Sequence, residues 1–219
     1  MSEVFFSSDF HYNHKNICRG TSSWDKFEKG GSHQQTRDFN SLDDMNKAIV
    51  KGINKKVGAD DILYFLGDWS FGGAESIWEF RNQINCQHIH LIYGNHDHHI
   101  ENNKLLKNPN PNHHITQLHA TNLFESCQYV KTVNIGKNSF FLSHYAHRVW
   151  NKSHHGRIHL YGHSHASLEH EPYGRSMDVG IDAYYRIFKR YEPFSVKEII
   201  DIMNNREVSV IDHHNSSTN

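Results

Sequence analysis

The stretch HIHLIYGNHD, residues 88–97, shows how the apolar segments of this chain end. A short run with strand character stops at a glycine, and Asn, His and Asp follow at once. Four other stretches have the same design: VFFSSDFH (4–11), ILYFLGD (62–68), FFLSH (140–144) and IHLYGHSH (158–165). Short apolar runs bounded by turn signals are typical of buried strands. The sequence therefore predicts five strands that each deliver polar side chains just beyond the carboxyl end.

These polar side chains are expected to surround one rim, because sites in α/β sheets lie beyond the carboxyl ends of the strands. The candidates are Asp9, His11, Asp68, Asn95, His144, His163 and His165. Carboxylate, amide and imidazole groups suit hard to borderline divalent metals, and the five ends carry no thiolate, which argues against a structural zinc site. Gly-Asp and Gly-Asn are also ordinary turn dipeptides. Five such ends together favour a metal site over five unrelated turns.

Helical segments alternate with the first strands. Apolar residues recur at steps of three and four over 41–57, which begins with capping-box spacing, and a second helix is predicted over 74–84. Residues 129–135 and 139–142 flank a Gly-Lys-Asn turn and predict a hairpin. Ser195 and a glutamate three residues later mark a further helix start. Strands and helices in alternation, followed mainly by strands, predict a layered α/β sandwich.

Two segments lack clear periodicity, residues 19–40 and 98–126, and loops of this length are usually either functional or disordered. Residues 98–126 directly follow the Gly-Asn-His-Asp motif and are rich in polar residues. We expect them to wall the substrate pocket rather than join the core. A single domain is expected over 1–212, followed by a disordered tail at 213–219.

The composition limits which binding partners and which cellular compartment are expected for this protein. The net charge of -1 gives no broad basic surface for duplex nucleic acid. Three widely spaced cysteines without a CxxC motif indicate reduced thiols and a cytoplasmic location. Neither a secretory signal nor an apolar run of the roughly 20 residues needed to span a membrane is visible, so no membrane association is expected. The oligomeric state stays open.

The order of the motifs resembles the calcineurin-like metallophosphoesterase superfamily. The motifs are Asp-x-His (9–11), Gly-Asp (67–68), Gly-Asn-His-Asp (94–97), His144 and Gly-His-x-His (162–165). Each is weak alone, but the combined set is highly specific and spans residues 1 to about 185. The resemblance implies two mixed β-sheets flanked by helices.

A closer resemblance is to a small, single-domain bacterial and phage branch of this superfamily, most of whose members are predicted phosphoesterases. It rests on DFHYNHKNI (9–17), HRVWNKSHHG (147–156) and GRSMDVG (174–180). One departure is Phe71, where several relatives carry an acidic residue. This difference touches no implied metal ligand, but it argues against transferring a substrate from those relatives.

The resemblance implies two divalent metal ions, with manganese, iron, zinc and nickel all open. One ion takes Asp9, His11 and His165. The other takes Asn95, His144 and His163. Asp68 bridges both ions, and a bridging hydroxide attacks phosphorus in line.

Further residues are candidates for substrate chemistry. The resemblance makes His96 the general acid or the stabiliser of the leaving oxygen, oriented by Asp97. Arg148 is the first candidate to bind phosphate, because a guanidinium fork matches phosphate oxygens. Weaker candidates for contact with the substrate are Arg37 for phosphate, and Tyr12, Trp69 and Trp150 for stacking on a base.

These features predict a small phosphodiesterase that acts on a nucleotide-like substrate. His96 is in place to assist a poor leaving group, and the chain is too short for a large cap domain around a monoester. Three alternatives stay open: a phosphomonoesterase or protein phosphatase, a nuclease acting on nucleic acid ends, and a non-catalytic scaffold. The scaffold is disfavoured because every ligand position is filled, and the nuclease because no Lys/Arg-rich run is present.

Overall fold

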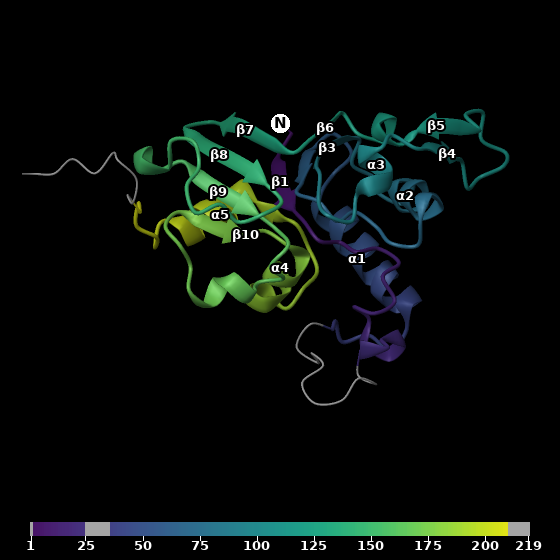
Figure 1. Ribbon diagram of the computed structural model, residues 1–219, viewed down its shortest axis with the longest axis horizontal. Helices are drawn as coiled ribbons and strands as arrows, with labels where there is room; N and C mark the ends of the chain where they lie inside the picture. The colour runs from purple at the N-terminus through teal and green to yellow at the C-terminus, as the bar shows by residue number, and fades with distance from the viewer. Residues whose placement is uncertain (1, 25–35, 210–219) are drawn as a thin grey trace, which may run out of the picture.

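Two β-sheets, each with its own helices, form the molecule in a computed structural model that describes residues 2–24 and 36–209 (Figure 1). The five-stranded sheet has the order β11 (Phe194–Ser195), β1 (Val4–Ser7), β2 (Ile62–Phe65), β3 (His88–Ile92) and β6 (Ser126–Gln128). The four-stranded sheet has the order β10 (Ser176–Asp178), β9 (Ile158–Tyr161), β8 (Asn138–Ser143) and β7 (Val130–Ile135). A separate hairpin joins β4 (Leu105–Lys107) and β5 (Gln117–His119).

Both main sheets are mixed. Strands β1, β2, β3 and β6 are parallel, and β11 joins β1 antiparallel. Strands β8, β9 and β10 are parallel, and β7 joins β8 antiparallel. The α-helices are α1 (Leu42–Lys56), α2 (Ala74–Arg81), α3 (His98–Glu101), α4 (Ile181–Phe188) and α5 (Val196–Met203). The predicted layered α/β sandwich with two mixed sheets is confirmed.

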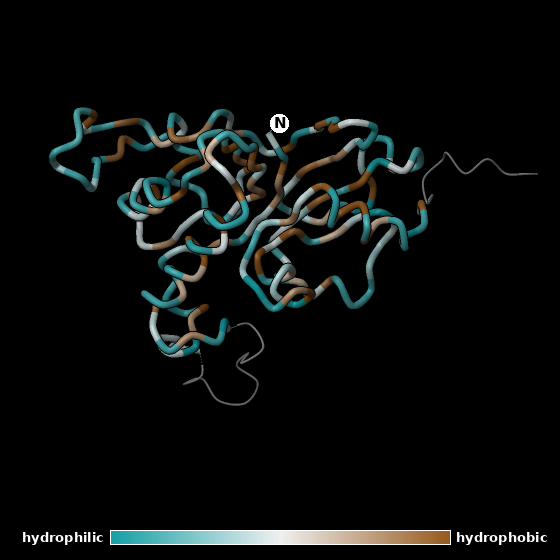
Figure 2. Tube along the Cα trace, turned by 180° about the vertical axis from the view of Figure 1, so that it is seen from behind, coloured by the Kyte–Doolittle hydropathy of each residue, from teal (hydrophilic) through white to brown (hydrophobic). Residues whose placement is uncertain are grey.

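The alternation of side chains along β1 divides the core in two. Phe5 packs in a cluster with α1, α2 and one face of β2 and β3. Phe6, on the opposite face of the strand, packs in a second cluster with α4, α5 and the four-stranded sheet. Figure 2 shows apolar stretches along the inner strands and polar stretches along many of the outer turns. The five-stranded sheet therefore lies between its own helices and the second sheet.

The helix over 41–57 forms where it was predicted. The Ser41 hydroxyl accepts a hydrogen bond from the Asp44 amide at 3.1 Å and caps the first turn of α1. Met45, Ile49 and Ile53 point into the core and are fully buried. At the start of α5, the Ser195 side chain and Glu198 form the complete capping box expected from their spacing. Among the described residues, no helix is long and apolar enough to cross a bilayer.

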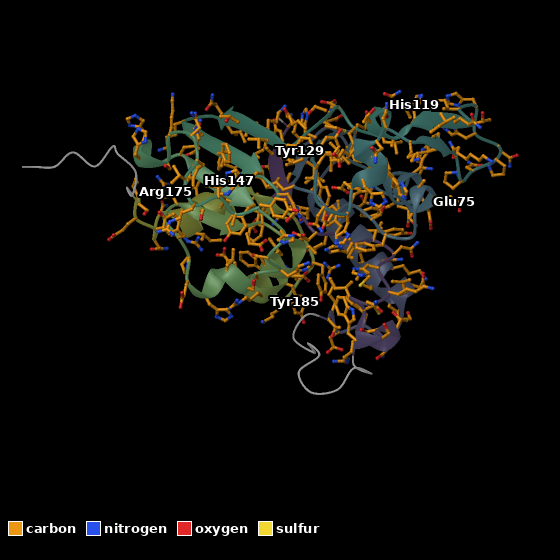
Figure 3. All side chains as sticks on the ribbon, viewed as in Figure 1. Glu75, His119, Tyr129, His147, Arg175 and Tyr185 are labelled. Atoms are coloured by element: carbon orange, nitrogen blue, oxygen red, sulfur yellow. The ribbon has the colours of Figure 1, made fainter. Side chains whose placement is uncertain are left out.

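The prediction that residues 98–126 would stay out of the core is wrong in part. Ile100, Leu106, Ala120 and Phe124 are buried in the cluster around α2. The hairpin β4–β5 projects at one end of the molecule, where Figure 3 labels His119, well away from the four-stranded sheet (Figures 1 and 3). The start of the segment, at α3, lines a pocket that includes His96.

Other predictions on connecting segments have separate outcomes. The helix predicted over 74–84 ends at Arg81. Of the segment 19–40, which lacks clear periodicity, residues 25–35 lie outside the described part. In the rest, Arg19–Thr21 forms a short 3-10 helix, and Arg37 forms a β-bridge with Cys18. The tail at 213–219 lies outside the described residues as well. The single domain over 1–212 stays a prediction.

The turns after β2 and β3 approach each other very closely. An added Cβ at Gly67 would lie 2.6 Å from the Gly94 Cα, and one at Gly94 would lie 2.4 Å from Asp68 Oδ1. Gly67 also has a φ of +96°, which side chains with a Cβ rarely adopt. Glycine at both positions allows the polar residues after the two strands to share one small space.

This close approach makes Gly94→Ala disruptive. The new methyl group meets Asp68 Oδ1 and the Asp68 main-chain nitrogen, which cannot move independently of β2. We expect the free energy of unfolding in urea to fall by about 1–3 kcal/mol. The matched control is Gly58→Ala, whose methyl group meets only the Asp61 carboxylate at 3.2 Å. Equal stability of the two variants would show that the turns separate easily.

Candidate metal centre

The carboxyl ends of the five predicted strands meet between the two sheets. Strands β1, β2 and β3 are parallel neighbours in one sheet, and β8 and β9 are parallel neighbours in the other. The two sheets are joined at this point, because the His163 amide donates to both carboxylate oxygens of Asp9 at 3.1 and 2.9 Å. The structure thus brings the seven candidate ligands to one rim.

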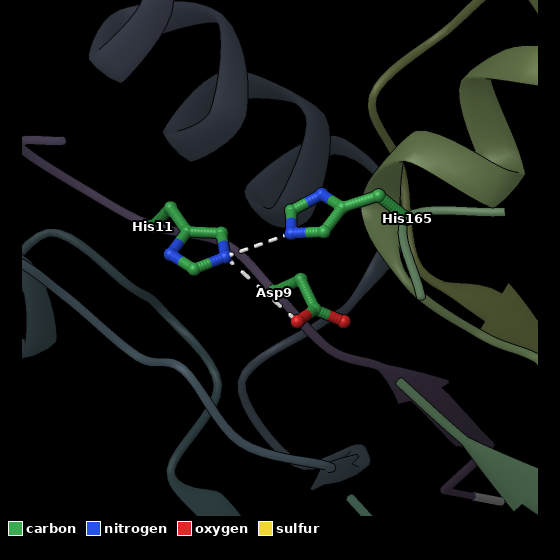
Figure 4. A group of neighbouring side chains, drawn as sticks. All are labelled: Asp9, His11 and His165. Atoms are coloured by element: carbon green, nitrogen blue, oxygen red, sulfur yellow. Dashed lines mark hydrogen bonds and ion pairs between the residues drawn. The ribbon is translucent and has the colours of Figure 1, made fainter. Parts of the chain in front are cut away.

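The first group of ligand atoms comes from Asp9, His11 and His165, whose rings and carboxylate point toward one another (Figure 4). His11 Nε2 lies 3.1 Å from His165 Nε2 and 3.8 Å from Asp9 Oδ1. It also lies 3.7 Å from Asp68 Oδ2. One ligand atom from each of Asp9, His11 and His165 lies within 4.8 Å of the other two, and Asp68 approaches His11 from a further side.

The second group shares Asp68 with the first. His144 Nε2 lies 3.7 Å from Asp68 Oδ2 and 2.9 Å from Asn95 Oδ1. His163 Nδ1 lies 2.9 Å from the same Asn95 oxygen. Asp68 Oδ2 thus lies 3.7 Å from one imidazole nitrogen of each group. This is the position that the predicted bridging carboxylate needs.

The backbone is strained at these ligands. Five of them have left-handed φ angles, which cost non-glycine residues about 1–3 kcal/mol each and cluster at functional sites. They are Asp9 (55°), His11 (50°), Asp68 (62°), His163 (63°) and His165 (45°). Folding therefore holds these side chains in place at a cost in stability.

Hydrogen bonds at the far ring nitrogens aim two of the imidazoles. His144 Nδ1 lies 2.7 Å from the Leu66 carbonyl, so it carries the proton and leaves the Nε2 lone pair toward Asp68. His165 Nδ1 lies 2.6 Å from Asp182 Oδ2, which leaves its Nε2 toward His11. Carboxylate and carbonyl partners of this kind orient metal-binding histidines and increase their basicity.

Arg37 has a different position from the one predicted. Its side chain is 3% exposed, and its guanidinium donates to both oxygens of Asp182 at 2.8 and 2.9 Å. It also donates to the Asp9 and Phe10 carbonyls at 2.6 and 2.7 Å. Arg37 therefore holds the carboxylate behind His165 and the turn that carries Asp9, and it is not placed to contact a substrate.

The electrostatics of the group call for a cation. Burial, together with the nearby Asp9 carboxylate, raises the pKa of Asp68. Burial and the neighbouring His165 lower the pKa of His11 well below its ordinary value, so its ring is neutral. Burial lowers the pKa of His165, but the hydrogen bond and charge of Asp182 outweigh it and bring it to about 9. Crowded carboxylates and converging lone pairs fit two divalent ions, which these seven residues would hold.

Asp97 orients main chain rather than the His96 ring. It is 2% exposed, and its Oδ2 accepts hydrogen bonds from the Asp68 and Gly94 amides at 2.9 and 2.8 Å. Its Oδ1 accepts from the Trp69 amide at 2.9 Å. Within the described residues it forms no hydrogen bond with the His96 side chain. The expectation that Asp97 orients the His96 ring is therefore wrong. Asp97 instead joins the turns after β2 and β3.

His96 stands exposed at the rim. Its main-chain amide donates to Asp68 Oδ1 at 2.9 Å, while its ring contacts Phe71 with centroids 4.5 Å apart. The ring forms no hydrogen bond with a described residue. Partial burial lowers its pKa below the ordinary value. The ring is therefore free to meet a ligand beside the bridging carboxylate.

The aromatic residues considered for base stacking are core residues instead. Tyr12 is 4% exposed and stacks on Phe80, with its hydroxyl donating to Glu79 at 3.0 Å. Trp69 is fully buried, and Trp150 is 6% exposed with its indole nitrogen donating to the Arg157 carbonyl. None of these three rings presents a face to the rim.

Arg148 is exposed and forms no ion pair or hydrogen bond with a described residue, so it stays available as a phosphate ligand.

Sequence reasoning did not find Asp182 or Asp178. Asp178 is fully buried and accepts a hydrogen bond from the Ala166 amide, which fixes the turn carrying His165. It lies within GRSMDVG, the stretch that carried part of the resemblance. Tyr145 was also missed; it is 49% exposed, beside the His163 ring.

A family model described as calcineurin-like phosphoesterase matches residues 3–200. The chain therefore belongs to this family, and it is a metal-dependent phosphoesterase. Members typically use two divalent metals, which agrees with two groups of side chains that could each hold an ion, Asp9 with His11 and His165, and Asp9 with Asp68 and His144.

A phage relative fits the predicted bacterial and phage branch. The Gene 66 protein of Mycobacterium phage L5 is 26% identical over 228 residues, covering 93% of this chain and 95% of the phage protein. An uncharacterised protein of Methanocaldococcus jannaschii is 33% identical over 99 residues, covering 44% of this chain and about half (48%) of that protein.

A solved structure shares the fold. The protein of unknown function AQ665 from Aquifex aeolicus superposes with a TM-score of 0.59 at 17% identity, covering 92% of this chain and 100% of that one. This likeness bears on the fold alone.

The contact between Asp182 and His165 is testable through metal affinity. We expect Asp182→Asn to weaken Mn²⁺ binding about 10–100-fold in calorimetric titration, because the imidazole loses the partner that orients it. Circular dichroism establishes that the variant is folded. The control Asp201→Asn breaks an exposed pair with Lys197 and should leave affinity unchanged. Unchanged affinity in Asp182→Asn would mean that Asp182 does not support the site.

Proposed function

We propose that this protein is a dinuclear phosphodiesterase that acts on a small, nucleotide-like phosphodiester. The observation that carries the proposal is the pair of ligand groups sharing Asp68 Oδ2, open on the side where His96 stands. When bound, two divalent ions supply positive charge and an activated water nucleophile. Manganese is our first choice of metal, because the carboxylate and amide oxygens of Asp9, Asp68 and Asn95 suit it.

The exposure of the seven proposed ligand residues favours one side of the centre for phosphate binding. Asn95 and His163 lie on the exposed side of the centre, and Asp9, Asp68 and His144 are buried beneath them. A phosphate would therefore approach from the side of Asn95. Arg148 follows His144 by four residues and has a free guanidinium, which suits a second phosphate oxygen.

His96 is the proposed general acid. Its main-chain amide donates to Asp68, and its ring has no hydrogen-bonding partner among the described residues. In its protonated form, the imidazolium can donate a proton to the departing ester oxygen and becomes a neutral imidazole. This assistance matters most for a poor leaving group such as a sugar alcohol, which favours natural esters over activated ones.

A diester is favoured because the centre has room beside it. A pocket of about 130 Å³ adjoins His96, and it offers a place for an ester arm beyond the phosphate. The cytoplasmic location forms part of the proposal, supported by free thiols at Cys18, Cys86 and Cys127.

We expect His96→Ala to lower kcat about 10²–10⁴-fold while the bound metal stays the same. The substitution removes the ring but keeps the amide that donates to Asp68. Rate and metal content are measured on the same preparation, with His114→Ala, an exposed histidine between β4 and β5, as the control. A parallel loss of metal would identify His96 as a ligand or a support of the site.

The preference for diesters is tested by comparing kcat/KM for bis(p-nitrophenyl) phosphate and p-nitrophenyl phosphate in one Mn²⁺ buffer. Cyclic and linear nucleotides follow as natural esters. A higher value for the diester, repeated among the nucleotides, is expected. Preference for the monoester in both sets would make the protein a phosphomonoesterase.

A further inference from the structure

The pocket beside His96 has its own chemistry, distinct from that of the metal centre. It lies between the turn Ser70–Gly73 and the start of α3, with Ile77 and Ile100 contributing apolar walls. Its volume of about 130 Å³ is close to that of an engineered protein cavity of about 150 Å³ that binds benzene. The size therefore suits a single aromatic ring better than a fused pair.

Phe71 forms a preorganised flat wall of this pocket. Its ring stacks on His14 with centroids 3.7 Å apart and planes 4° apart, which fixes its orientation. The same ring contacts His96 at 4.5 Å and the metal-centre residue His11 at 5.2 Å. The wall thus connects the pocket with the place where the phosphate binds.

The pocket lacks a free acidic or basic side chain other than imidazole among its described lining residues. Asp97 is its one carboxylate, and three main-chain amides occupy both of its oxygens. An arm with a further phosphate would find no Lys or Arg here. The pocket therefore suits an uncharged arm and not a continuing nucleic acid strand.

Two polar atoms at the pocket residues lack a partner. Ser70 Oγ and His99 Nδ1 are both buried without a hydrogen bond in the described part of the chain. Buried polar groups are nearly always paired in native proteins. Rotation of either side chain toward the pocket would let a ring with hydrogen-bonding groups on its edge, such as a pyrimidine, supply the missing partner.

We propose that this pocket binds the leaving arm of the phosphodiester, and that the arm carries a single uncharged aromatic ring, such as a pyrimidine, that lies against Phe71. This inference rests on the proposed function and narrows its substrate class. The ester oxygen of such an arm lies toward His96, where it receives the proton as the bond to phosphorus breaks. The nucleophilic hydroxyl stays on the phosphate product.

The test compares the binding of phosphonates to the Mn²⁺-loaded protein by calorimetric titration. Phenylphosphonate is expected to bind about tenfold more tightly than methylphosphonate, which is within the range measured for stacking one ring on an aromatic side chain. 1-Naphthylphosphonate should show no further gain, because the second ring exceeds the pocket. Equal affinities for phenyl and methyl, or tighter binding of naphthyl, would overturn the proposal.

Variants locate the arm. Phe71→Ala should reduce the phenyl-to-methyl affinity ratio to near one while methylphosphonate binding persists, and Phe71→Leu should restore only part of the ratio. The matched control is Tyr145→Ala, which removes an exposed ring next to His163, on the other ligand group. Loss of the ratio with Tyr145→Ala and not with Phe71→Ala would place the arm elsewhere.

This design separates the two proposals. Phosphonate binding reports on the pocket whether or not diesters are hydrolysed, and the comparison of diester and monoester rates reports on the proposed function alone. If the enzyme prefers monoesters but binds phenylphosphonate about tenfold more tightly than methylphosphonate, the proposal for the pocket stands and the proposal of a diesterase is wrong.

Discussion

Two carboxylates, Asp9 and Asp68, are buried where the two sheets meet, 0% and 2% exposed. Such a pair is unfavourable in a protein interior unless a positive charge compensates it. Arg37 bonds the main chain of Asp9 and the carboxylate of Asp182, not these two carboxylates. The imidazolium of His165, whose pKa is about 9, supplies part of this charge, and ions held between the ligand groups would supply the rest.

The scaffold accepts local costs to keep this arrangement. Five ligands adopt left-handed backbone conformations, and the turns after β2 and β3 fit together only because Gly67 and Gly94 lack a Cβ. Behind the ligands, Arg37, Asp182 and Asp178 hold the turns in place through buried hydrogen bonds. The metal centre on its own would accept many phosphate esters. The proposed pocket against Phe71 would select among them by the shape of the ester arm.

Local sequence patterns predicted the features that depend on residues close together in the chain. The strand ends, the cap at Ser41 and the motif order predicted the sheets, α1 and the meeting of seven ligands at one rim. Arg37 was misplaced because its partner Asp182 lies 145 residues away in sequence. Residues 98–126 looked uniformly polar because their few core anchors, such as Leu106 and Phe124, are widely spaced. Helix α4 begins at Ile181 after Gly180, which offers no side-chain cap, so no start signal marked the helix or Asp182. The rings of Tyr12 and Trp69 lie next to ligand motifs, and only packing shows that they face the core.

The central claim is that two ions share Asp68, and anomalous scattering from crystals grown with Mn²⁺ tests it most directly. The account predicts two peaks roughly 3.5–4 Å apart, one beside Asp9, His11 and His165 and the other beside Asn95, His144 and His163, with the Asp68 carboxylate between them. A single peak at full Mn²⁺ occupancy, or two peaks without Asp68 as a shared ligand, would contradict it.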